Sequence, residues 1–190
     1  MRILGIESSS LVASVALVTD DVLTAEYTMN FKKTHSQTLL PMLDEIANML
    51  ELDLNTIDAI AVAAGPGSFT GLRIGSATGK GLGLALKKPL IHIPTVDAMA
   101  YNLYGCPDLI CPIMDARRNQ VYTGLYRFRR ELETVKEQTP MDMGELIGEL
   151  NARGERVIFL GDGVPVYRAM IEEKMTAEYD FAPPHVNRQR

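Results

Sequence analysis

Short apolar runs separated by polar turns open the chain. Residues 2–6, 13–19 and 22–29 each read as a strand, and the polar stretches 7–10 and 20–21 read as the turns between them. Adjacent strands joined by such short turns pair antiparallel. The pattern therefore predicts a three-stranded β-meander.

The hydrophobic period changes after residue 34, which predicts a helix from His35 to about Leu50. Thr34 and Gln37 match a capping box, in which the two side chains satisfy each other's backbone donors at a helix start. Pro41 lacks a backbone donor and predicts a kink inside this helix. The apolar residues recur at spacings of three and four: Leu39, Leu40, Leu43, Ile46, Ala47 and Leu50.

Alternating strand and helix signals follow. Residues 59–64 form a continuous apolar run that ends at a Gly-Pro-Gly turn, which is typical of a buried strand. We expect a helix over 69–86, a strand over 89–93, and a helix over 95–104 that ends at Gly105.

The same order of elements begins again after Cys106-Pro107. Each half reads as three strands, a helix, a strand and a helix, which predicts a duplicated α/β unit with a mixed sheet in each half and a cleft between them. We place the domains at 1–106 and 107–190. In the second half the expected strands are 109–116, 120–128, 132–137 and 156–160, with one helix opened by Asp142 and Glu145 as a capping box and another after Gly163.

Composition and charge exclude several classes of protein. The chain has 190 residues, 46% of them hydrophobic, and 19 Lys+Arg against 24 Asp+Glu give a net charge of −5. A protein that binds nucleic acid by itself needs a basic surface to neutralise phosphates, so we exclude that class. The longest uncharged stretch, 59–72, is too short to span a bilayer, and the first residues lack the apolar region of a secretory signal. We expect a cytoplasmic protein with no membrane contact.

Two turns carry candidate phosphate chemistry. In the first, Glu7 could hold a metal while the hydroxyls and amides of Ser8 and Ser9 cup a phosphate, although serine-rich turns are common without any ligand. The matching turn of the second half runs from Asp115 and carries Arg117 next to a second arginine. Bulky arginines stand where close backbone approach to a phosphate favours glycine, so a solvated hairpin or a contact with an acidic partner fits better.

The segment from Gly65 to Gly71 is a strand-to-helix turn rich in glycine. Helix N-terminal amides could bind an anion here, but a purely structural turn explains the same residues. The three histidines lie on separate elements without a metal-ligand spacing, and no nucleophile motif is present.

A glycine row marks the helix expected over 69–86. Gly71, Gly75, Gly79 and Gly83 recur every four residues, and Ala77, Gly81 and Ala85 form a second small-residue row. Each interior glycine lowers helix stability by about 1 kcal/mol relative to alanine, so a close packing partner must compensate. On the residues alone, that partner is either the domain's own sheet or a helix of another subunit.

Several segments together resemble the TsaB family, also called YeaZ. They are ILGIESSS at the start, Thr34-His35-Ser36 with Leu39-Leu40-Pro41, GPGSFTGLRIG from Gly65 to Gly75, the Asp115-Ala116-Arg117 turn with Val121-Tyr122, and Gly161-Asp162-Gly163. The match runs from Met1 to about Gly163, and the motifs are specific in combination.

The resemblance implies an actin-like, Hsp70-like ATPase fold of two RNase H-like halves. It also implies a role as the scaffold subunit of the bacterial tRNA threonylcarbamoyladenosine (t6A) machinery, with the catalytic paralogue TsaD and the small ATPase TsaE as partners. We expect tRNA contact only through that complex, and a homodimer when the chain is alone. Family members generally continue beyond this length, so we expect the second half to lack its final segment.

Departures from the catalytic paralogue imply a non-catalytic subunit. TsaD carries a His-x-x-x-His metal pair where this chain has Thr95 and Met99. Active members of the superfamily have Asp in the first phosphate turn and glycines in the second, whereas Glu7 and the arginine pair stand here. We therefore expect no catalytic residue, no metal and no cofactor in the isolated chain. The rival reading is a metal-dependent peptidase or phosphotransferase that uses the cleft between the halves, and Thr95 and Met99 argue against it.

The two helices of the first half are the expected partner surface. A four-helix interface would form when they pair with the same helices of the paralogue or of a second copy. The residues predicted for it are His35, Leu39, Leu43, Leu72, Gly75, Gly79, Leu82 and Gly83.

Overall fold

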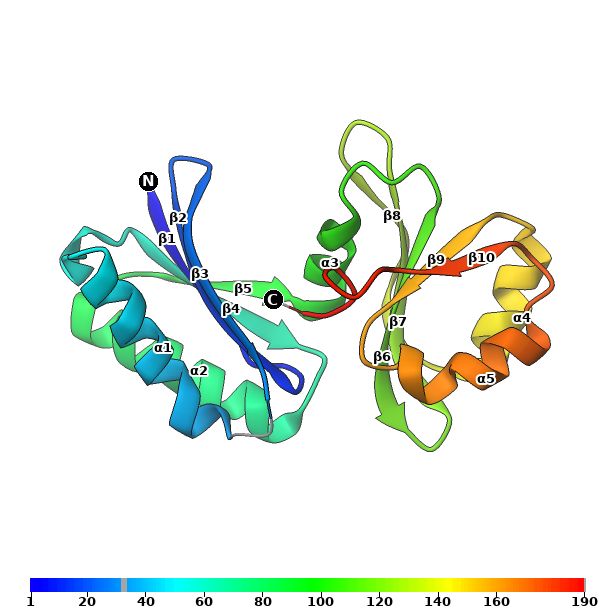
Figure 1. The fold of residues 1–190 in the computed structure, drawn as a ribbon, viewed down its shortest axis with the longest axis horizontal. Coiled ribbons are helices and arrows are strands. Elements are labelled where there is room, and N and C mark those ends of the chain that lie inside the picture. The colour runs from blue at the N-terminus through cyan, green and yellow to red at the C-terminus, as the bar shows by residue number, and fades with distance from the viewer. Residues whose placement is uncertain (32–33, 190) are drawn as a thin grey trace. The chain divides into compact units, whose positions relative to one another are not determined.

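The chain divides into two compact units in a computed structural model that describes residues 1–31 and 34–189 (Figure 1). The first unit comprises Met1–Thr95 together with Gln189, and the second comprises Val96–Arg188. Each unit has its own sheet and its own hydrophobic core.

The first unit is built on a five-stranded sheet in the order β3-β2-β1-β4-β5. The first three strands form the predicted antiparallel meander, and β4 and β5 add in parallel beyond β1. The bounds are β1 Arg2–Glu7, β2 Val12–Thr19, β3 Val22–Asn30, β4 Ala59–Gly65 and β5 Leu90–Pro94.

Two helices cover one face of this sheet. Helix α1 spans His35–Met49 and α2 spans Phe69–Leu86, and a short 3-10 turn, Leu54–Thr56, precedes β4. The helices contact each other and lie side by side in Figure 1. The apolar stripe of α1 buries a continuous core, in agreement with the period-3.6 pattern of the sequence, and Ile74 and Leu82 of α2 pack against it half-buried. This core contains Leu4, Ile6, Ala13, Val15, Leu39, Met42, Leu43, Ile46, Ile57, Ile60 and Val62.

The second unit repeats the same architecture. Its sheet has the order β8-β7-β6-β9-β10, again with three antiparallel strands followed by two parallel ones. The bounds are β6 Leu109–Arg117, β7 Gln120–Phe128, β8 Leu132–Asp142, α4 Met143–Arg153, β9 Val157–Leu160, α5 Val164–Lys174 and β10 Tyr179–Phe181. The predicted duplication is therefore confirmed by topology.

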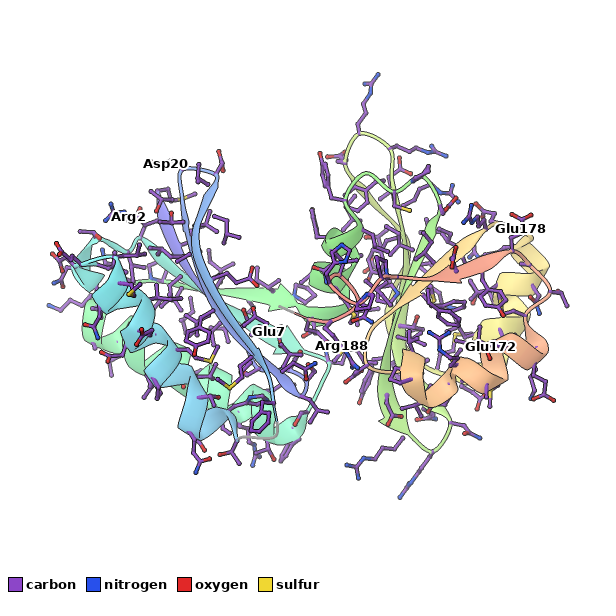
Figure 2. All side chains as sticks on the ribbon, viewed as in Figure 1. Arg2, Glu7, Asp20, Glu172, Glu178 and Arg188 are labelled. Atoms are coloured by element: carbon purple, nitrogen blue, oxygen red, sulfur yellow. The ribbon has the colours of Figure 1, made fainter. Side chains whose placement is uncertain are left out.

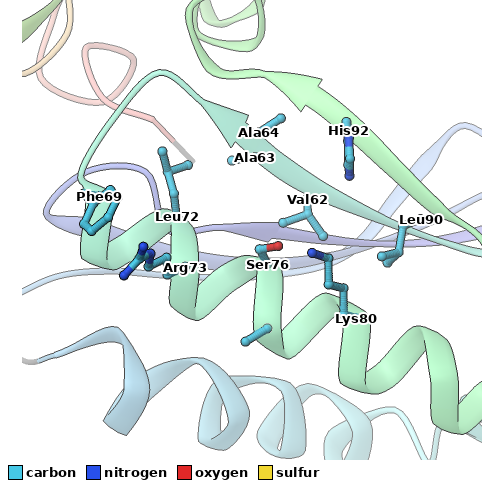
Figure 3. Close-up of a pocket in the computed structure, with 11 residues that line it drawn as sticks. Val62, Ala63, Ala64, Phe69, Leu72, Arg73, Ser76, Lys80, Leu90 and His92 are labelled. Atoms are coloured by element: carbon cyan, nitrogen blue, oxygen red, sulfur yellow. The ribbon is translucent and has the colours of Figure 1, made fainter.

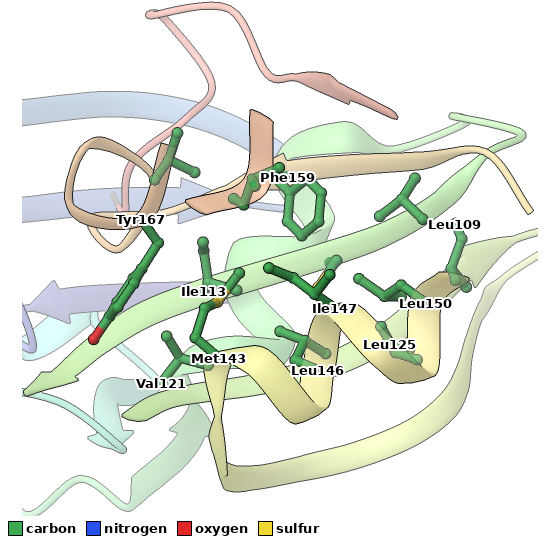
Figure 4. Close-up of a cluster of buried hydrophobic side chains, with 14 residues drawn as sticks. Leu109, Ile113, Val121, Leu125, Met143, Leu146, Ile147, Leu150, Phe159 and Tyr167 are labelled. Carbon is green, nitrogen blue, oxygen red and sulfur yellow. The ribbon is translucent and has the colours of Figure 1, made fainter. Parts of the chain in front are cut away.

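Side chains of α4 and α5 pack on the second sheet (Figure 4). Leu146 and Leu150 of α4 and Phe159 of β9 are fully buried in this cluster. A separate cluster joins α3, Thr95–Ala100, to the same unit, because Val96 and Met99 pack with Tyr126 and Phe128 of β7. A 3-10 turn, Tyr101–Leu103, continues α3.

The structure differs from the sequence expectations in four places. The domain boundary placed at residue 106 is too late, because α3 packs with the second unit. The strand β10 was missed, and β8 extends to Asp142 rather than stopping at 137. The capping box at Thr34 is not formed either, since among the described residues no backbone donor bonds to the Thr34 side chain.

None of the described helices is both long enough and apolar enough to cross a membrane.

Candidate functional site

The turn after β1 is buried and fastened to the start of α2. The Ser8 hydroxyl donates a hydrogen bond of 2.9 Å to the Gly71 carbonyl oxygen, and the Ser68 backbone N–H donates one of 2.6 Å to the Ser9 carbonyl oxygen. Ser8 and Ser9 are fully buried. The turn that the sequence offered as a phosphate site is thus part of the contact between β1 and α2.

The glycines of the next turn are required by this contact. A Cβ atom at Gly67 would overlap the Ser9 carbonyl oxygen, and one at Gly71 would overlap the Ser8 carbonyl oxygen. These glycines let the backbone of Ser8 and Ser9 approach closely. Residues 65–71 therefore fit a structural turn better than an anion-binding site.

Glu7 lies at the end of β1 among buried side chains of the first unit (Figure 2). Burial raises the pKa of its carboxyl group above 4.5, and hydrogen bonds from Ser9 oppose that shift. Nearby, His35 of α1 donates from Nε2 to the Ser10 carbonyl oxygen at 2.7 Å. The turn therefore ties β1 to both helices of the unit.

The matching turn of the second unit is a tight hairpin rather than an anion cradle. Arg117, Arg118 and Asn119 have φ of 65°, 53° and 60°, the left-handed region. Asp115 closes the hairpin, because its Oδ1 accepts a 2.8 Å hydrogen bond from the Arg117 N–H. Both arginines are exposed.

Two further residues, Tyr167 and Asp162, contact this hairpin, and the sequence pattern assigned a role to neither. Tyr167 of α5 donates from its hydroxyl to Asp115 Oδ1 at 3.1 Å, and Asp162 Oδ1 accepts from the Asp115 N–H at 3.3 Å. Burial raises the pKa of Asp162. The Gly161-Asp162-Gly163 segment was the sequence feature that marked this position, but its residues and spacing do not predict a contact with Asp115.

The positions that hold the metal pair in the catalytic paralogue do not fit a metal here. Thr95 and Met99 are buried, and neither side chain supplies an imidazole. The Met99 sulfur lies 3.0 Å from the point that a Cβ atom at Gly161 would occupy, so Met99 packs against the turn that follows β9. Across residues 1–31 and 34–189, no group of three or more His, Cys, Asp or Glu side chains is placed to hold a metal ion.

The glycine row of α2 faces the domain's own sheet. Gly71, Gly75, Gly79 and Gly83 are the four buried residues of this helix. A Cβ atom would overlap the Ser8 hydroxyl at Gly75, would lie 2.6 Å from a Val62 methyl carbon at Gly79, and would lie 3.1 Å from the Lys88 carbonyl oxygen at Gly83. The prediction that Gly75, Gly79 and Gly83 form a partner surface is therefore wrong.

The leucines predicted for the same surface are also turned inward. Leu39 and Leu43 are buried in the core of the first unit, so their assignment to the partner surface is wrong as well. His35, Leu72 and Leu82 are half-buried. Of these two helices, the outer side is the part left exposed for a partner helix.

That outer side carries the second small-residue row. A Cβ atom at Gly81 would meet no heavy atom within 4 Å among the described residues, and Ala77 and Ala85 beside it are exposed. Large apolar side chains accompany the row, with Leu84 exposed by 83% and Met49 by 78%. We call these exposed positions of α1 and α2 the helical face: Leu40, Met49, Ala77, Gly81, Leu84 and Ala85.

The two helices carry charges of opposite sign. Helix α1 contains Asp44 and Glu45 and no basic residue after His35, whereas α2 contains Arg73 and Lys80 and no acidic residue. An acidic helix beside a basic one is electrostatically complementary to a similar pair related by a two-fold axis.

Comparisons with known proteins agree with this architecture. The family model described as "TsaD: tRNA N6-adenosine threonylcarbamoyltransferase" matches residues 25–187. The tRNA threonylcarbamoyladenosine biosynthesis protein TsaB of Bacillus subtilis is 35% identical over 175 residues, covering 91% of this chain and 76% of the relative. The protein of the same name from Haemophilus influenzae is 31% identical over 203 residues, with 97% and 81% covered.

A solved structure shows the same fold. YeaZ from Pseudomonas aeruginosa superposes with a TM-score of 0.77 at 23% identity, covering 99% of this chain and 86% of that one. The fold expected from the sequence, two mixed sheets each flanked by helices, is therefore confirmed. This chain belongs to the TsaB family, also called YeaZ, of tRNA threonylcarbamoyladenosine biosynthesis proteins.

Proposed function

We propose that this chain is a non-catalytic subunit that binds a TsaD-type threonylcarbamoyltransferase through the helical face. In this proposal the complex, together with a TsaE-type ATPase, modifies adenosine 37 of tRNA, and the chain contacts tRNA only within the complex. The observation that carries the proposal is the exposed row Ala77, Gly81 and Ala85. Small residues at this spacing let a partner helix approach closely.

Relatedness to the enzyme supports a paired arrangement. The TsaD family model matches residues 25–187, a range that includes both α1 and α2, and the proposal gives the enzyme an equivalent pair of helices. Two copies of one fold can pair through equivalent surfaces about a pseudo-two-fold axis, which places acidic α1 of each subunit against basic α2 of the other. The same geometry makes a homodimer the expected state of the isolated chain.

The residues at the two phosphate turns and at Thr95 and Met99 support the non-catalytic part of the proposal. The first turn is occupied by the chain's own packing, since Gly67 and Gly71 touch Ser8 and Ser9. Neither Thr95 nor Met99 can replace an imidazole ligand of a metal ion.

The test is a substitution at Gly81 with a matched control at Gly148. Both glycines are exposed positions inside a helix, and at both an added Cβ atom would meet no heavy atom of the described chain within 4 Å. Leucine at either position raises helix propensity, so both variants should fold at least as well as the parent. Gly81→Leu should abolish co-purification with the TsaD protein of the same organism and the t6A activity of the reconstituted complex.

Gly148→Leu should leave both measurements unchanged. Sedimentation of the isolated chain should show a dimer for the parent and for Gly148→Leu, and a monomer for Gly81→Leu. A folded Gly81→Leu variant that still binds the TsaD protein as tightly as the parent would refute the helical face as the docking surface.

A further inference from the structure

A groove of about 500 Å³ runs along α2 on the side where the helix meets β4 and β5 (Figure 3). Its walls are apolar, with Val62 of β4, Leu72 of α2 and Leu90 of β5 among them. The size is that of pockets that take a small ligand or a few residues of a peptide. Nothing in the proposed pairing with TsaD uses Val62, Leu72 or Leu90.

Polar groups at the groove are almost all hydrogen-bond donors. Arg73, Ser76 and Lys80 project from α2, and His92 projects from β5. Residues 59–96 contain no Asp or Glu, although the whole chain has a net charge of −5. In the described part of the chain neither Arg73 nor Lys80 enters an ion pair, whereas Arg127, Lys136, Arg153 and Arg156 are each paired with a carboxylate.

The two cations are held apart by the geometry of the helix. Arg73 and Lys80 are two helical turns from each other, which separates their Cα atoms by about 10 Å along the axis. The Arg73 guanidinium also lies over the Phe69 ring at 3.8 Å, which restricts its position. Between the cations the helix presents only Ser76 and Ala77, so the middle of the groove is open to an apolar group.

A ligand that satisfies this groove carries two negative charges about 10 Å apart with an apolar group between them. One phosphate or one carboxylate reaches only one end. In an extended peptide, side chains at positions i, i+2 and i+4 share a face, and the outer two are about 13 Å apart. Long Arg and Lys side chains readily cover the difference.

We propose that this groove binds an extended acidic segment of a partner protein, in which two carboxylates flank an apolar side chain. The carboxylates pair with Arg73 and Lys80, and the apolar side chain packs on Val62, Leu72 and Leu90. This binding site shares Arg73, Ala77 and Lys80 with the proposed pairing, but its apolar wall of Val62, Leu72 and Leu90 takes no part in that pairing, so a change at the wall tests it separately.

The experiment is an NMR titration of the full-length chain with the blocked peptide Glu-Ser-Leu-Ser-Glu. We expect amide shifts concentrated at Arg73, Ser76, Lys80 and His92, and an affinity that falls as salt rises. Lys80→Glu should weaken binding about tenfold or more, as expected for reversal of a paired charge. Lys174→Glu, on α5 of the other unit, makes the same change in net charge and should have little effect.

Two further arms separate the groove from a simple cation site. Replacing the peptide's leucine by serine should weaken binding, and Ala64→Phe, a change at an exposed position of β4 beside the groove, should block it. Retained binding of the serine peptide, or equally tight binding of succinate or inorganic phosphate, would overturn the proposal. Shifts that map outside the groove, or no shifts at all, would also overturn it. Ala64→Phe should still bind the TsaD protein, which distinguishes failure of this site from failure of the helical face.

Discussion

A Cβ atom at Gly79 would lie 2.6 Å from a methyl carbon of Val62, so α2 packs on β4 with no room for a side chain at residue 79. Gly81, two residues later, faces open space. Gly79→Leu should therefore lower the free energy of unfolding by about 1–3 kcal/mol or more through overpacking. Gly81→Ala should raise it by up to about 1 kcal/mol, because alanine favours the helix. Urea denaturation followed by circular dichroism measures both, and equal effects at the two positions would contradict this orientation of α2.

Buried Glu7 should give the protein a distinctive pH dependence. Its pKa is raised in the folded state, so its contribution to stability is complete below about pH 4.5 and is lost as the pH rises through the folded-state value. Asp20 and Glu149 have lowered pKa values, so their contributions to stability change with pH in the opposite direction. The reference protein is therefore Glu7→Gln, which lacks the titrating carboxyl group. Its side-chain oxygen can still accept the hydrogen bond from the Ser9 N–H. Relative to that variant, the parent should lose stability in urea titrations as the pH rises above about 4.5. A stability difference that does not change with pH would show that the carboxyl group is not desolvated.

Tyr126 and Asp97 fasten α3 to the second sheet. The Tyr126 hydroxyl donates to Asp97 Oδ1 at 2.6 Å, and the ring is fully buried. Tyr126→Phe should destabilise the protein by about 1.5–3 kcal/mol, the range for a hydrogen bond to a charged group. Tyr179→Phe is the control, since no hydrogen bond is formed by its hydroxyl within the described residues, and it should have little effect. Thermal melting of the two variants makes the comparison.

The two predicted capping boxes differ in the structure. Asp142 Oδ1 accepts hydrogen bonds from the N–H groups of Gly144 and Glu145, at 2.8 Å and 3.2 Å, whereas the Thr34 side chain caps no described backbone donor. Asp142→Ala should cost about 0.5–2 kcal/mol of stability, as at other helix N-caps. Thr34→Ala should change stability by less than about 0.5 kcal/mol. Chemical denaturation distinguishes the two outcomes, and a large loss at Thr34 would show that the capping box forms in solution.

Local sequence signals predicted the elements better than their orientation. The Gly-Pro-Gly turn and the apolar period placed α2 at Phe69–Leu86, as observed. Both small-residue rows of α2 have the same spacing, however, and only the tertiary contacts with Ser8 and Val62 decide which row is buried. The strand β10 has three residues, too few for a periodic pattern to indicate it.

The domain boundary failed for a related reason. Cys106-Pro107 has the local composition of a linker, but a boundary depends on which core the flanking side chains enter. Val96 and Met99 enter the core of the second unit. Several residues predicted for the partner surface, such as Leu39 and Gly79, are likewise buried against the sheet, because the choice between core and exterior cannot be made without the sheet.

The glycine content of α2 also has a consequence for how the first unit folds. Its four buried glycines make the segment a poor helix by itself, so a free peptide of this sequence would be largely unstructured in water. The helix is stabilised by the sheet on which it packs, so we expect the two to form together in one cooperative step. A partner that binds the exposed side of α2 therefore recognises the folded unit and not the unfolded chain, and mass action will raise the unit's thermal stability in proportion to the logarithm of partner concentration once the partner is in excess.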